Sequence, residues 1–444
     1  MRLFRPNTIG VSFYIAVLCA TFLGSCGIIN SQDKQLQKVE FIDEKFYDQT
    51  GCKYTGYTNL VMAGYQGWFA AEGDESNRGW YHYGIKREQD PGYTSIDMWP
   101  DMSEYIKKYE TPFKYADGSS AFLYSPYDEE SIDLHFKWMK EYGIDGVHMQ
   151  RFLVEVKNNG KGKRHFDKVL ANALKAAKKY GRAISVMYDL SGSRSEDMEA
   201  LIKDWEELVS TFNLFDNHEH PTYLRHKGKP MMSIWGVGFN DSRKYTIEDV
   251  DGLVNRLKGS DNKQSIMLGV PYYWRTLGND TENSTLLHDL IKKVDIIMPW
   301  AVGRYKHQSY NPKYVAKDVE WCEKNNVDYV PLVFPGFTWG NLRKDPDLYN
   351  QIPRKNGEFL WRQVAGAKEG GAKSLYVAMF DEVDEGTAIF KVKKEKEVPL
   401  NGDGDFKFVG IEQGADTDYY LWLTGQASNW FHGNSGYSKE KPIR

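Results

Sequence analysis

The sequence has 444 residues, of which 41% are hydrophobic and 27% are charged, a balance typical of a globular protein with a sizeable core. Its formal net charge of -4 excludes the strongly basic surface that attracts nucleic acid or anionic lipid. The four cysteines, Cys19, Cys26, Cys52 and Cys322, stand at no spacing typical of a metal site, and we expect neither a metal nor another cofactor.

The first thirty residues have the pattern of a bacterial lipoprotein signal peptide. Basic residues precede a mostly apolar run at positions 9–23, which has the length of a signal core and is short for a membrane-spanning helix. The run ends in Leu-Gly-Ser-Cys, where small residues fit a peptidase and the thiol of Cys26 accepts lipid. We expect residues 1–25 to be removed, residues 26–53 to form a lipidated tether, and the protein to be anchored in the bacterial cell envelope, in the outer membrane on its periplasmic or surface face. Cleavage after Ser25 beside an incidental Cys26 is the alternative.

Strand-like and helix-like patterns then alternate along the chain. Eight apolar runs predict strands at residues 60–66, 146–151, 183–189, 230–236, 265–270, 294–300, 328–333 and 374–380. Helical periodicity predicts helices at residues 129–142, 165–180, 196–211, 247–258, 284–293, 312–325 and 358–369. This alternation implies right-handed βαβ units, and eight strands predict a (β/α)8 barrel over residues 54–390. A doubly wound open sheet is the alternative.

Two segments do not belong to this alternation. Residues 120–125 could form a ninth strand, but we assign them to the connection before the first helix, because that helix begins at residues 128–130. Residues 391–444 begin with a charged run and contain short apolar pieces at 406–411 and 419–423. We expect this C-terminal extension to be a small appendage packed on the barrel.

The active site of such a barrel lies at the carboxyl ends of its strands. Here all eight predicted strands end in aromatic or charged residues, and the flat faces and polar tips of Tyr and Trp suit sugar rings. The sequence therefore predicts a saccharide site. The candidate substrate-binding residues are Tyr65, Gln66, Trp68, Arg151, Asp189, Trp235, Tyr272, Trp300, Trp339 and Asp384, with Trp274 as a further lining residue.

Three of the polar residues at these ends have structural interpretations as well. An ion pair between Arg151 and Asp189 would make both part of the scaffold instead of the site. His82 is expected to make an ordinary polar contact, because no second His or Cys stands at metal-ligand spacing.

The eighth strand delivers four carboxylates within five residues: Asp381, Glu382, Asp384 and Glu385. Buried unpaired carboxylates are strongly disfavoured, so the strand is expected to end at a water-filled pocket. Glycoside hydrolysis uses two such carboxylates, and crowding raises the pKa of at least one of them, which keeps it protonated. A solvated acidic loop that happens to follow a strand is the alternative.

Three segments together resemble the glycoside hydrolase family 71/99-like group: residues 61–69, 143–152 and 380–387. The resemblance covers residues 60–390 and implies a (β/α)8 barrel. Family 99 enzymes cleave α-mannosidic bonds internally with retention, and family 71 enzymes are α-1,3-glucanases. The family 99 motif Glu-Trp-His-Glu-Gly, at the end of the last strand, places its two glutamates on Glu382 and Glu385.

The resemblance also implies roles for these residues. Glu382 would assist the 2-hydroxyl of the substrate as nucleophile, and Glu385 would be the acid/base. Val383 and Asp384 stand where the motif has Trp and His, and Asp381 stands where an Asn precedes it, so we expect the sugar specificity to differ. A catalytic role for Asp381 or Asp384 is the alternative.

The predicted function is therefore a retaining glycoside hydrolase acting on an oligosaccharide or polysaccharide. It would contact the membrane only through its lipid anchor and would bind no nucleic acid. A non-catalytic, glycan-binding surface lipoprotein is the first alternative, and an epimerase or lyase on the same barrel is another, because fold does not fix function.

Overall fold

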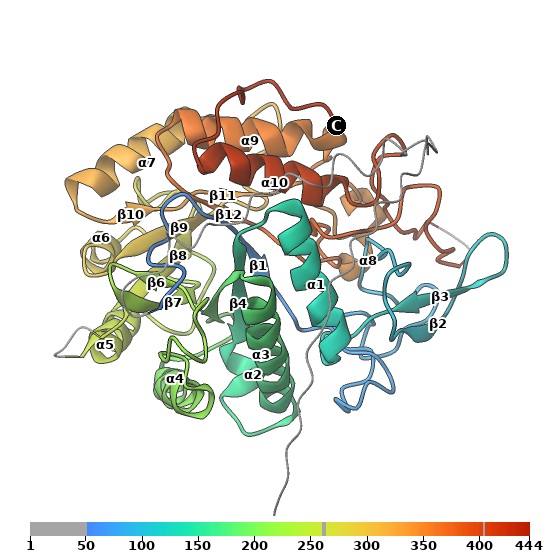
Figure 1. The fold of residues 1–444 in the computed structure, drawn as a ribbon, viewed down its shortest axis with the longest axis horizontal. Coiled ribbons are helices and arrows are strands. Elements are labelled where there is room, and N and C mark those ends of the chain that lie inside the picture. Colours follow the sequence, from blue (N-terminus) through green and yellow to red (C-terminus); the bar gives the residue numbers. More distant parts are fainter. Residues whose placement is uncertain (1–50, 260–262, 403–404) are drawn as a thin grey trace, which may run out of the picture. The chain divides into compact units, whose positions relative to one another are not determined.

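The computed structural model describes residues 51–259, 263–402 and 405–444 (Figure 1). The predicted signal peptide, the lipidation of Cys26 and the tether up to residue 50 lie outside the described residues. None of the helices in the described ranges is long and apolar enough to cross a membrane.

The main sheet is a parallel barrel. Its strands follow the chain in the order β1 (Val61–Tyr65), β4 (Gly146–Phe152), β5 (Ala183–Asp189), β7 (Lys229–Trp235), β8 (Ser265–Pro271), β9 (Ile296–Trp300), β10 (Asp328–Tyr329), β11 (Leu332–Val333) and β12 (Leu375–Val377). A short strand, β6 (Arg225–His226), pairs with β7 in the antiparallel direction. The prediction of a (β/α)8 barrel is confirmed.

The predicted seventh strand closes this barrel in two pieces. Its first piece, β10, pairs with β9, and its second piece, β11, pairs with β12. Between them the N–H of Val330 donates to the carbonyl of Ile297 (2.9 Å), and the N–H of Tyr376 donates to the carbonyl of Pro331 (3.0 Å). Because Pro331 has no N–H to donate, the ladder is interrupted there while the chain still bridges its two neighbours.

The helices surround the barrel (Figure 1). Those between strands are α1 (Glu129–Tyr142), α3 (Lys161–Tyr180), α4 (Met198–Phe212), α5 (Ile247–Lys258), α6 (Leu286–Ile291), α7 (Lys313–Lys324) and α9 (Glu358–Glu369). Shorter turns are α2 (Leu153–Val156), α8 (Gly340–Arg343), and the 3-10 segments η2 (Ser195–Asp197), η3 (Pro346–Leu348) and η4 (Lys355–Gly357). In α1, for example, Ile132, Phe136 and Met139 repeat at helical spacing and are buried, and Gly143 ends the helix with a φ of 78°.

The connection between β1 and α1 forms a separate hairpin. Strands β2 (Tyr109–Lys114) and β3 (Ser120–Leu123) pair with each other in the antiparallel direction, outside the barrel sheet. The assignment of residues 120–125 to this connection is therefore confirmed.

The C-terminal extension supplies the eighth helix of the barrel. Helix α10 (Tyr419–Phe431) packs between α9 and α1 (Figure 1), where Trp430 stacks on Trp361 at a ring distance of 5.5 Å. Only short apolar pieces were predicted here. Residues on most faces of α10 are buried, so its sequence lacks the one-sided period that marks a surface helix.

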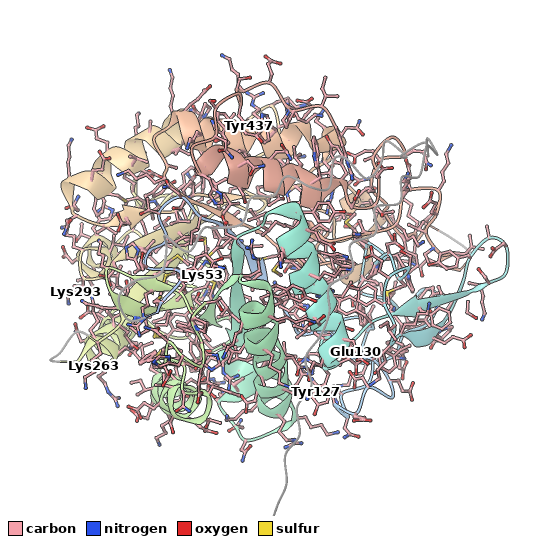
Figure 2. The ribbon with its side chains drawn as sticks, in the orientation of Figure 1. Lys53, Tyr127, Glu130, Lys263, Lys293 and Tyr437 are labelled. Carbon is pink, nitrogen blue, oxygen red and sulfur yellow. The ribbon has the colours of Figure 1, made fainter. Side chains whose placement is uncertain are left out.

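Side chains of the barrel strands alternate between two cores. One core cluster fills the inside of the barrel and is rich in methionine, with Met62, Met187, Met231, Met267, Met298 and Met379. The other lies between strands and helices. Side chains fill the space within the fold in Figure 2, whereas the exposed Lys293 lies at the left edge of the view. Alternation along each strand thus decides which residues reach the site.

Candidate active site

The four clustered carboxylates follow β12 and are mostly buried. After the strand, the N–H of Phe380 donates to the carbonyl of Gly64 (2.7 Å), which keeps the chain at the end of β1. Only 0% of Asp381, 3% of Glu382 and 2% of Asp384 is exposed, and Glu385 is half-buried. The alternative of a solvated acidic loop is therefore wrong.

Asp381 anchors this loop to the end of β1. Its two oxygens accept hydrogen bonds from the backbone N–H groups of Gln66 (2.7 Å) and Gly67 (2.9 Å). Burial raises its pKa to about 7, although both hydrogen bonds favour the charged form. Since both oxygens are used, Asp381 serves to position its neighbours.

Glu382 is held on both sides. The side chain of Gln66 donates to one of its oxygens, and the hydroxyl of Thr387 donates to the other. Its pKa is raised well above the ordinary value, first by burial and then by the charges of Glu385 and Asp384. Thr387 was not among the predicted site residues, although it lies in the same motif stretch.

Glu385 has a different environment. Burial and the neighbouring Asp384 raise its pKa to about 7, and the guanidinium of Arg343 opposes this shift. Arg343 lies over the ring of Trp339 at 4.3 Å. Within the described ranges no side chain or backbone group donates to the Glu385 carboxyl, while its own carbonyl accepts from the N–H of Thr338 (3.0 Å). The carboxyl is thus fixed through its backbone and open to a ligand.

Asp384 faces a histidine from the long connection after β1. Nδ1 of His82 lies 3.3 Å from one Asp384 oxygen, and burial lowers the pKa of His82 to about 3, so the ring is neutral. Trp68 stacks on His82 with a centroid distance of 3.8 Å and an angle of 5°, and Phe152 stacks on Trp68 at 4.9 Å. His82 was expected to make an ordinary polar contact. The structure shows that the partner in this contact is Asp384, a member of the carboxylate cluster.

Three predicted tryptophans lie at the carboxyl ends of the barrel strands. Trp235, Trp300 and Trp339 all pack against the interior core cluster. Tyr272 does not join them, because its ring packs on Tyr314 of α7 at 5.7 Å, and its prediction as a site residue is corrected. The rings of Trp235 and Trp300 meet edge to face at 5.1 Å. Gly269 makes this possible, because a Cβ there would lie 2.3 Å from the Trp235 ring.

Asp189 stands beside Trp235 in the sheet register. One of its oxygens accepts from the N–H of Ser191 (2.6 Å), and burial raises its pKa. Asp189 therefore lies next to Trp235, at a strand position that faces the barrel interior.

Several buried polar atoms around these residues have no hydrogen-bond partner in the described part of the chain. Buried polar atoms are normally satisfied, so unpaired ones at or just after the carboxyl ends of several strands indicate a place for water or a ligand. These atoms are Gln66 Oε1, Trp68 Nε1, Asp384 Oδ1, Trp235 Nε1 and Trp339 Nε1.

The structure turns two other predicted site residues away from the barrel interior. The Tyr65 hydroxyl hydrogen-bonds His135 Nδ1 (2.8 Å) in the outer core. The Arg151 guanidinium, 2% exposed, pairs with Asp204 (2.6 Å) and Asp167 (2.7 Å), so its prediction as a substrate-binding residue is corrected, and the alternative ion pair with Asp189 is also wrong. Tyr65 and Arg151 occupy outward strand positions, next to the inward Gln66 and Gln150.

Trp274 also lies outside the group. It is 0% exposed and its ring packs edge to face on Trp321 at 4.8 Å. The expectation that it lines the site is corrected, because this indole is enclosed beneath α7 in the outer core.

Asp97 is a positioning residue that the sequence did not indicate. Its carboxylate accepts from the Thr338 hydroxyl and from the N–H groups of Gly340 (2.8 Å) and Asn341 (2.7 Å). Its own N–H donates to the carbonyl of Val383 (3.0 Å), between the two glutamates. One aspartate thereby ties the Trp339 loop to the carboxylate loop, and nothing in its local sequence distinguishes it from other loop aspartates.

Neither metal nor thiol chemistry is indicated by what the structure describes. No group of three or more His, Cys, Asp or Glu side chains within the described ranges is arranged to hold a metal ion. Cys52 and Cys322 are both buried and form no disulfide with each other.

Comparisons with known proteins agree with this geometry at the level of the fold. No family model and no curated protein matches the sequence. The GH99 endo-α-mannosidase from Bacteroides thetaiotaomicron, solved with Bis-Tris propane, is 16% identical with a TM-score of 0.60, over 84% of this chain and 97% of that chain. A second structure of that enzyme is 14% identical with a TM-score of 0.61, over 85% and 99% of the two chains. The fold of the protein is thus similar to that of the GH99 endo-α-mannosidase.

Proposed function

We propose that the protein is a glycoside hydrolase in which Glu382 and Glu385 act as a pair. The observation that carries this proposal is their setting: two neighbouring carboxyls with raised pKa values, at the carboxyl end of a barrel, surrounded by unpaired buried polar atoms. The likeness of the fold to glycoside hydrolases supports it.

The family resemblance assigns the roles of the two glutamates, with Glu385 as the proton donor to the leaving oxygen and Glu382 as the base. Gln66 and Thr387 donate to Glu382 and favour its charged form, but burial and the charges of Glu385 and Asp384 raise its pKa well above the ordinary value. The pKa of Glu385 is raised to about 7, so the two carboxyls can share a proton near neutral pH.

The family resemblance supplies the remaining steps. Glu382 takes the proton of the sugar 2-hydroxyl as the 2-oxygen attacks the anomeric carbon, and Glu385 protonates the departing glycosidic oxygen. Glu385, now ionised, then takes a proton from water as the water opens the cyclic intermediate, and Glu382 returns its proton to the 2-oxygen. Two inversions give net retention. The 2-hydroxyl requirement limits substrates to sugars in which that group is free.

Asp384 is the proposed specificity residue. Asp384 replaces the motif histidine, and one of its oxygens is buried without a partner, which suits a substrate hydroxyl. A site with such an unpaired oxygen discriminates against sugars that have no hydroxyl in position to donate a hydrogen bond to it. The substrate is accordingly proposed to differ from the mannoside of family 99.

A product screen tests the proposal. The full-length protein is incubated with α-mannans, α-glucans and plant glycans, and released saccharides are separated and quantified beside the Glu382→Gln variant. We expect wild-type protein to release defined products from one class and the variant to release them at a rate lower by about 10²–10⁴-fold. Equal release by both proteins contradicts the assigned pair. Saturable binding without any release favours the non-catalytic glycan-binding alternative.

We also propose that the chain is anchored through lipid on Cys26, a proposal supported only by the sequence around it. Expression in a bacterium fed an alkyne fatty acid should label the wild-type protein but not the Cys26→Ala variant. Equal labelling of the two proteins excludes Cys26 as the lipidated residue.

A further inference from the structure

A second concave site lies between the C-terminal extension and the loops that flank the carboxylates. Its volume is about 550 Å³, within the range of small-molecule sites. Its walls include Thr338, which holds the Glu385 carbonyl at 3.0 Å, and Gly386, the residue after Glu385. The Trp and carboxyl side chains of the active-site group are not among its lining residues. The cavity is therefore lined by residues other than the active-site side chains, although one of them, Gly386, directly follows Glu385 in the chain.

The cavity contains a buried arginine with unused hydrogen-bonding capacity. Arg354 is 7% exposed, and its Nη2 donates to the carbonyls of Gly386 (2.9 Å) and Ala388 (2.6 Å). Its Nη1 is buried without a hydrogen-bond partner, and no carboxylate of the described chain lies within ion-pair distance of it. Burial of a cation without a counter-charge is costly and lowers its pKa.

The nearby acid does not neutralise this arginine directly. Glu412, which also lines the cavity, accepts from the Tyr420 hydroxyl (3.1 Å) and from the N–H of Asn356 (2.7 Å). The Arg354 guanidinium instead lies over the Tyr420 ring at 4.5 Å, an arrangement that orients its plane. An oriented guanidinium with a free edge is suited to a planar carboxylate.

The remaining lining combines aromatic and aliphatic side chains with amide and charged groups, the charged ones being Glu395, Lys396, Lys407 and Glu412. Phe337 and Phe408 are 6% and 4% exposed, and Phe406 joins them in the wall, with Asn350 as a polar group. Aromatic faces pack against the C–H faces of sugar rings, and one anionic contact fixes orientation. An inorganic anion would leave most of a volume of about 550 Å³ unfilled.

We propose that this cavity is an accessory binding site for an acidic saccharide, with the sugar carboxylate on Arg354 and the ring against the phenylalanine wall. That the ligand is a saccharide rests on the proposed function. That it carries an anionic group is inferred from Arg354 and does not depend on the proposed function. Because Arg354 also holds the carbonyls of Gly386 and Ala388, the occupied site stabilises the segment that follows Glu385.

Calorimetric titration of the full-length protein tests this site. The probes are sodium D-galacturonate, D-galactose and sodium sulfate. We expect galacturonate to give a saturable component that Arg354→Gln and Ala116→Trp each weaken by about tenfold or more, the first by removing the cation and the second by filling the cavity. Ala116→Trp makes no change at Arg354, so it decides the outcome if Arg354→Gln misfolds. Lys396→Gln, which removes an exposed cation from the same wall, should bind within about twofold of wild type.

The titration also separates this proposal from the catalytic one. Glu382→Gln should retain the galacturonate component, because the carboxyl lies outside the cavity lining. A component that persists unchanged in Ala116→Trp overturns the site. Equal affinity for galactose overturns the role of Arg354, and equal affinity for sulfate overturns the saccharide class. No turnover is measured, so these results stand whether or not the protein hydrolyses glycans.

Discussion

Aspartates at the two ends of the barrel differ in what surrounds their carboxylates. At the amino end, Asp328 accepts from His226 Nε2 (2.8 Å) and pairs with Lys227 (3.0 Å), and its pKa falls to about 2. At the carboxyl end, one Asp384 oxygen contacts a neutral His82, the other is buried without a hydrogen-bond partner in the described chain, and burial raises the pKa to about 7. The carboxylate of Asp328 thus has charged and hydrogen-bonding partners, whereas one oxygen of Asp384 has no hydrogen-bond partner in the described chain.

This contrast suggests that charges at the two ends of the barrel serve different purposes, stability at the amino end and substrate binding at the carboxyl end. A residue at the amino face contributes to stability, whereas a strained charge at the carboxyl face is available to a substrate. Asp145, just before β4, accepts from the N–H of Val61 (2.7 Å) and pairs with His432 (3.0 Å), although its Oδ1, like that of Asp384, has no hydrogen-bond partner in the described chain. The predictions below test whether the two ends respond differently to the loss of a charge.

The largest effect is expected at Glu385. Replacing Glu385 with Gln removes the proposed proton donor and should lower the hydrolysis rate by about 10²–10⁴-fold on the substrate found in the screen. The measurement is release of reducing ends under saturating substrate. Asp328→Asn is the matched control from the opposite end and should retain the wild-type rate. A similar loss in both variants would contradict the contrast between the ends.

The next effect concerns an outward residue at the carboxyl end. Arg151→Met leaves the Asp204 carboxylate, 4% exposed, without its guanidinium partner and should reduce the free energy of unfolding by about 3–5 kcal/mol. Urea unfolding measures it. The double variant Arg151→Met with Asp204→Leu should recover most of the loss, because no charge then remains unpaired. An unchanged midpoint in the single variant would show that Arg151 is not part of the scaffold.

A smaller effect with the opposite sign is expected at Asp384. Its folded pKa of about 7 exceeds the ordinary value of 3.8, so ionisation costs stability increasingly as pH rises through that interval. Asp384→Asn removes the cost and should raise the free energy of unfolding at pH 8 by about 1–3 kcal/mol, with little change at pH 4. Thermal unfolding at both pH values measures this. Parallel curves for variant and wild type would contradict it.

The same variant also tests the coupling between carboxyls. Asp384 raises the pKa of Glu385, so Asp384→Asn should move the alkaline limb of the pH–rate profile to lower pH. A limb that stays in place would mean that Asp384 does not act on the proton donor.

The smallest effect is expected at Asp328. Its folded pKa of about 2 lies below the ordinary 3.8, so its contribution is present at neutral pH and is lost as pH falls through that interval. Because its side chain is 48% exposed, solvent screening reduces the stability lost in Asp328→Asn to about 1 kcal/mol at pH 7. Differential scanning calorimetry at pH 7 and pH 2 should show the loss only at pH 7. Stabilisation by this change would show that the two ends respond alike.

Predictions from local pattern succeeded where burial is one-sided. The bounds of β5, α1, α5 and α9 match the expected ranges of 183–189, 129–142, 247–258 and 358–369. Helix α10 was missed because most of its faces are buried, and the seventh strand is split because Pro331 cannot donate to the ladder.

The site was predicted less evenly than the fold. Counting strands located Glu382, Asp384 and Glu385 at the end of the last one, but neighbouring residues at other strand ends face opposite sides. Arg151 faces the helices while Gln150 faces the interior, and Tyr65 and Gln66 differ in the same way. The period-two rule could have separated these pairs, had the inward register been known.

The sequence alone determined the alternation of strands and helices, because each element buries one face and the period of apolar residues records this. It also determined that the last strand ends in carboxylates. Only the tertiary structure decided that His82 meets Asp384, that Asp97 joins the Trp339 loop to the carboxylate loop, and that Arg354 lines a separate cavity. These contacts join residues hundreds of positions apart in the chain, and the pattern of neighbours along a sequence carries no record of which distant loops a closed barrel brings together.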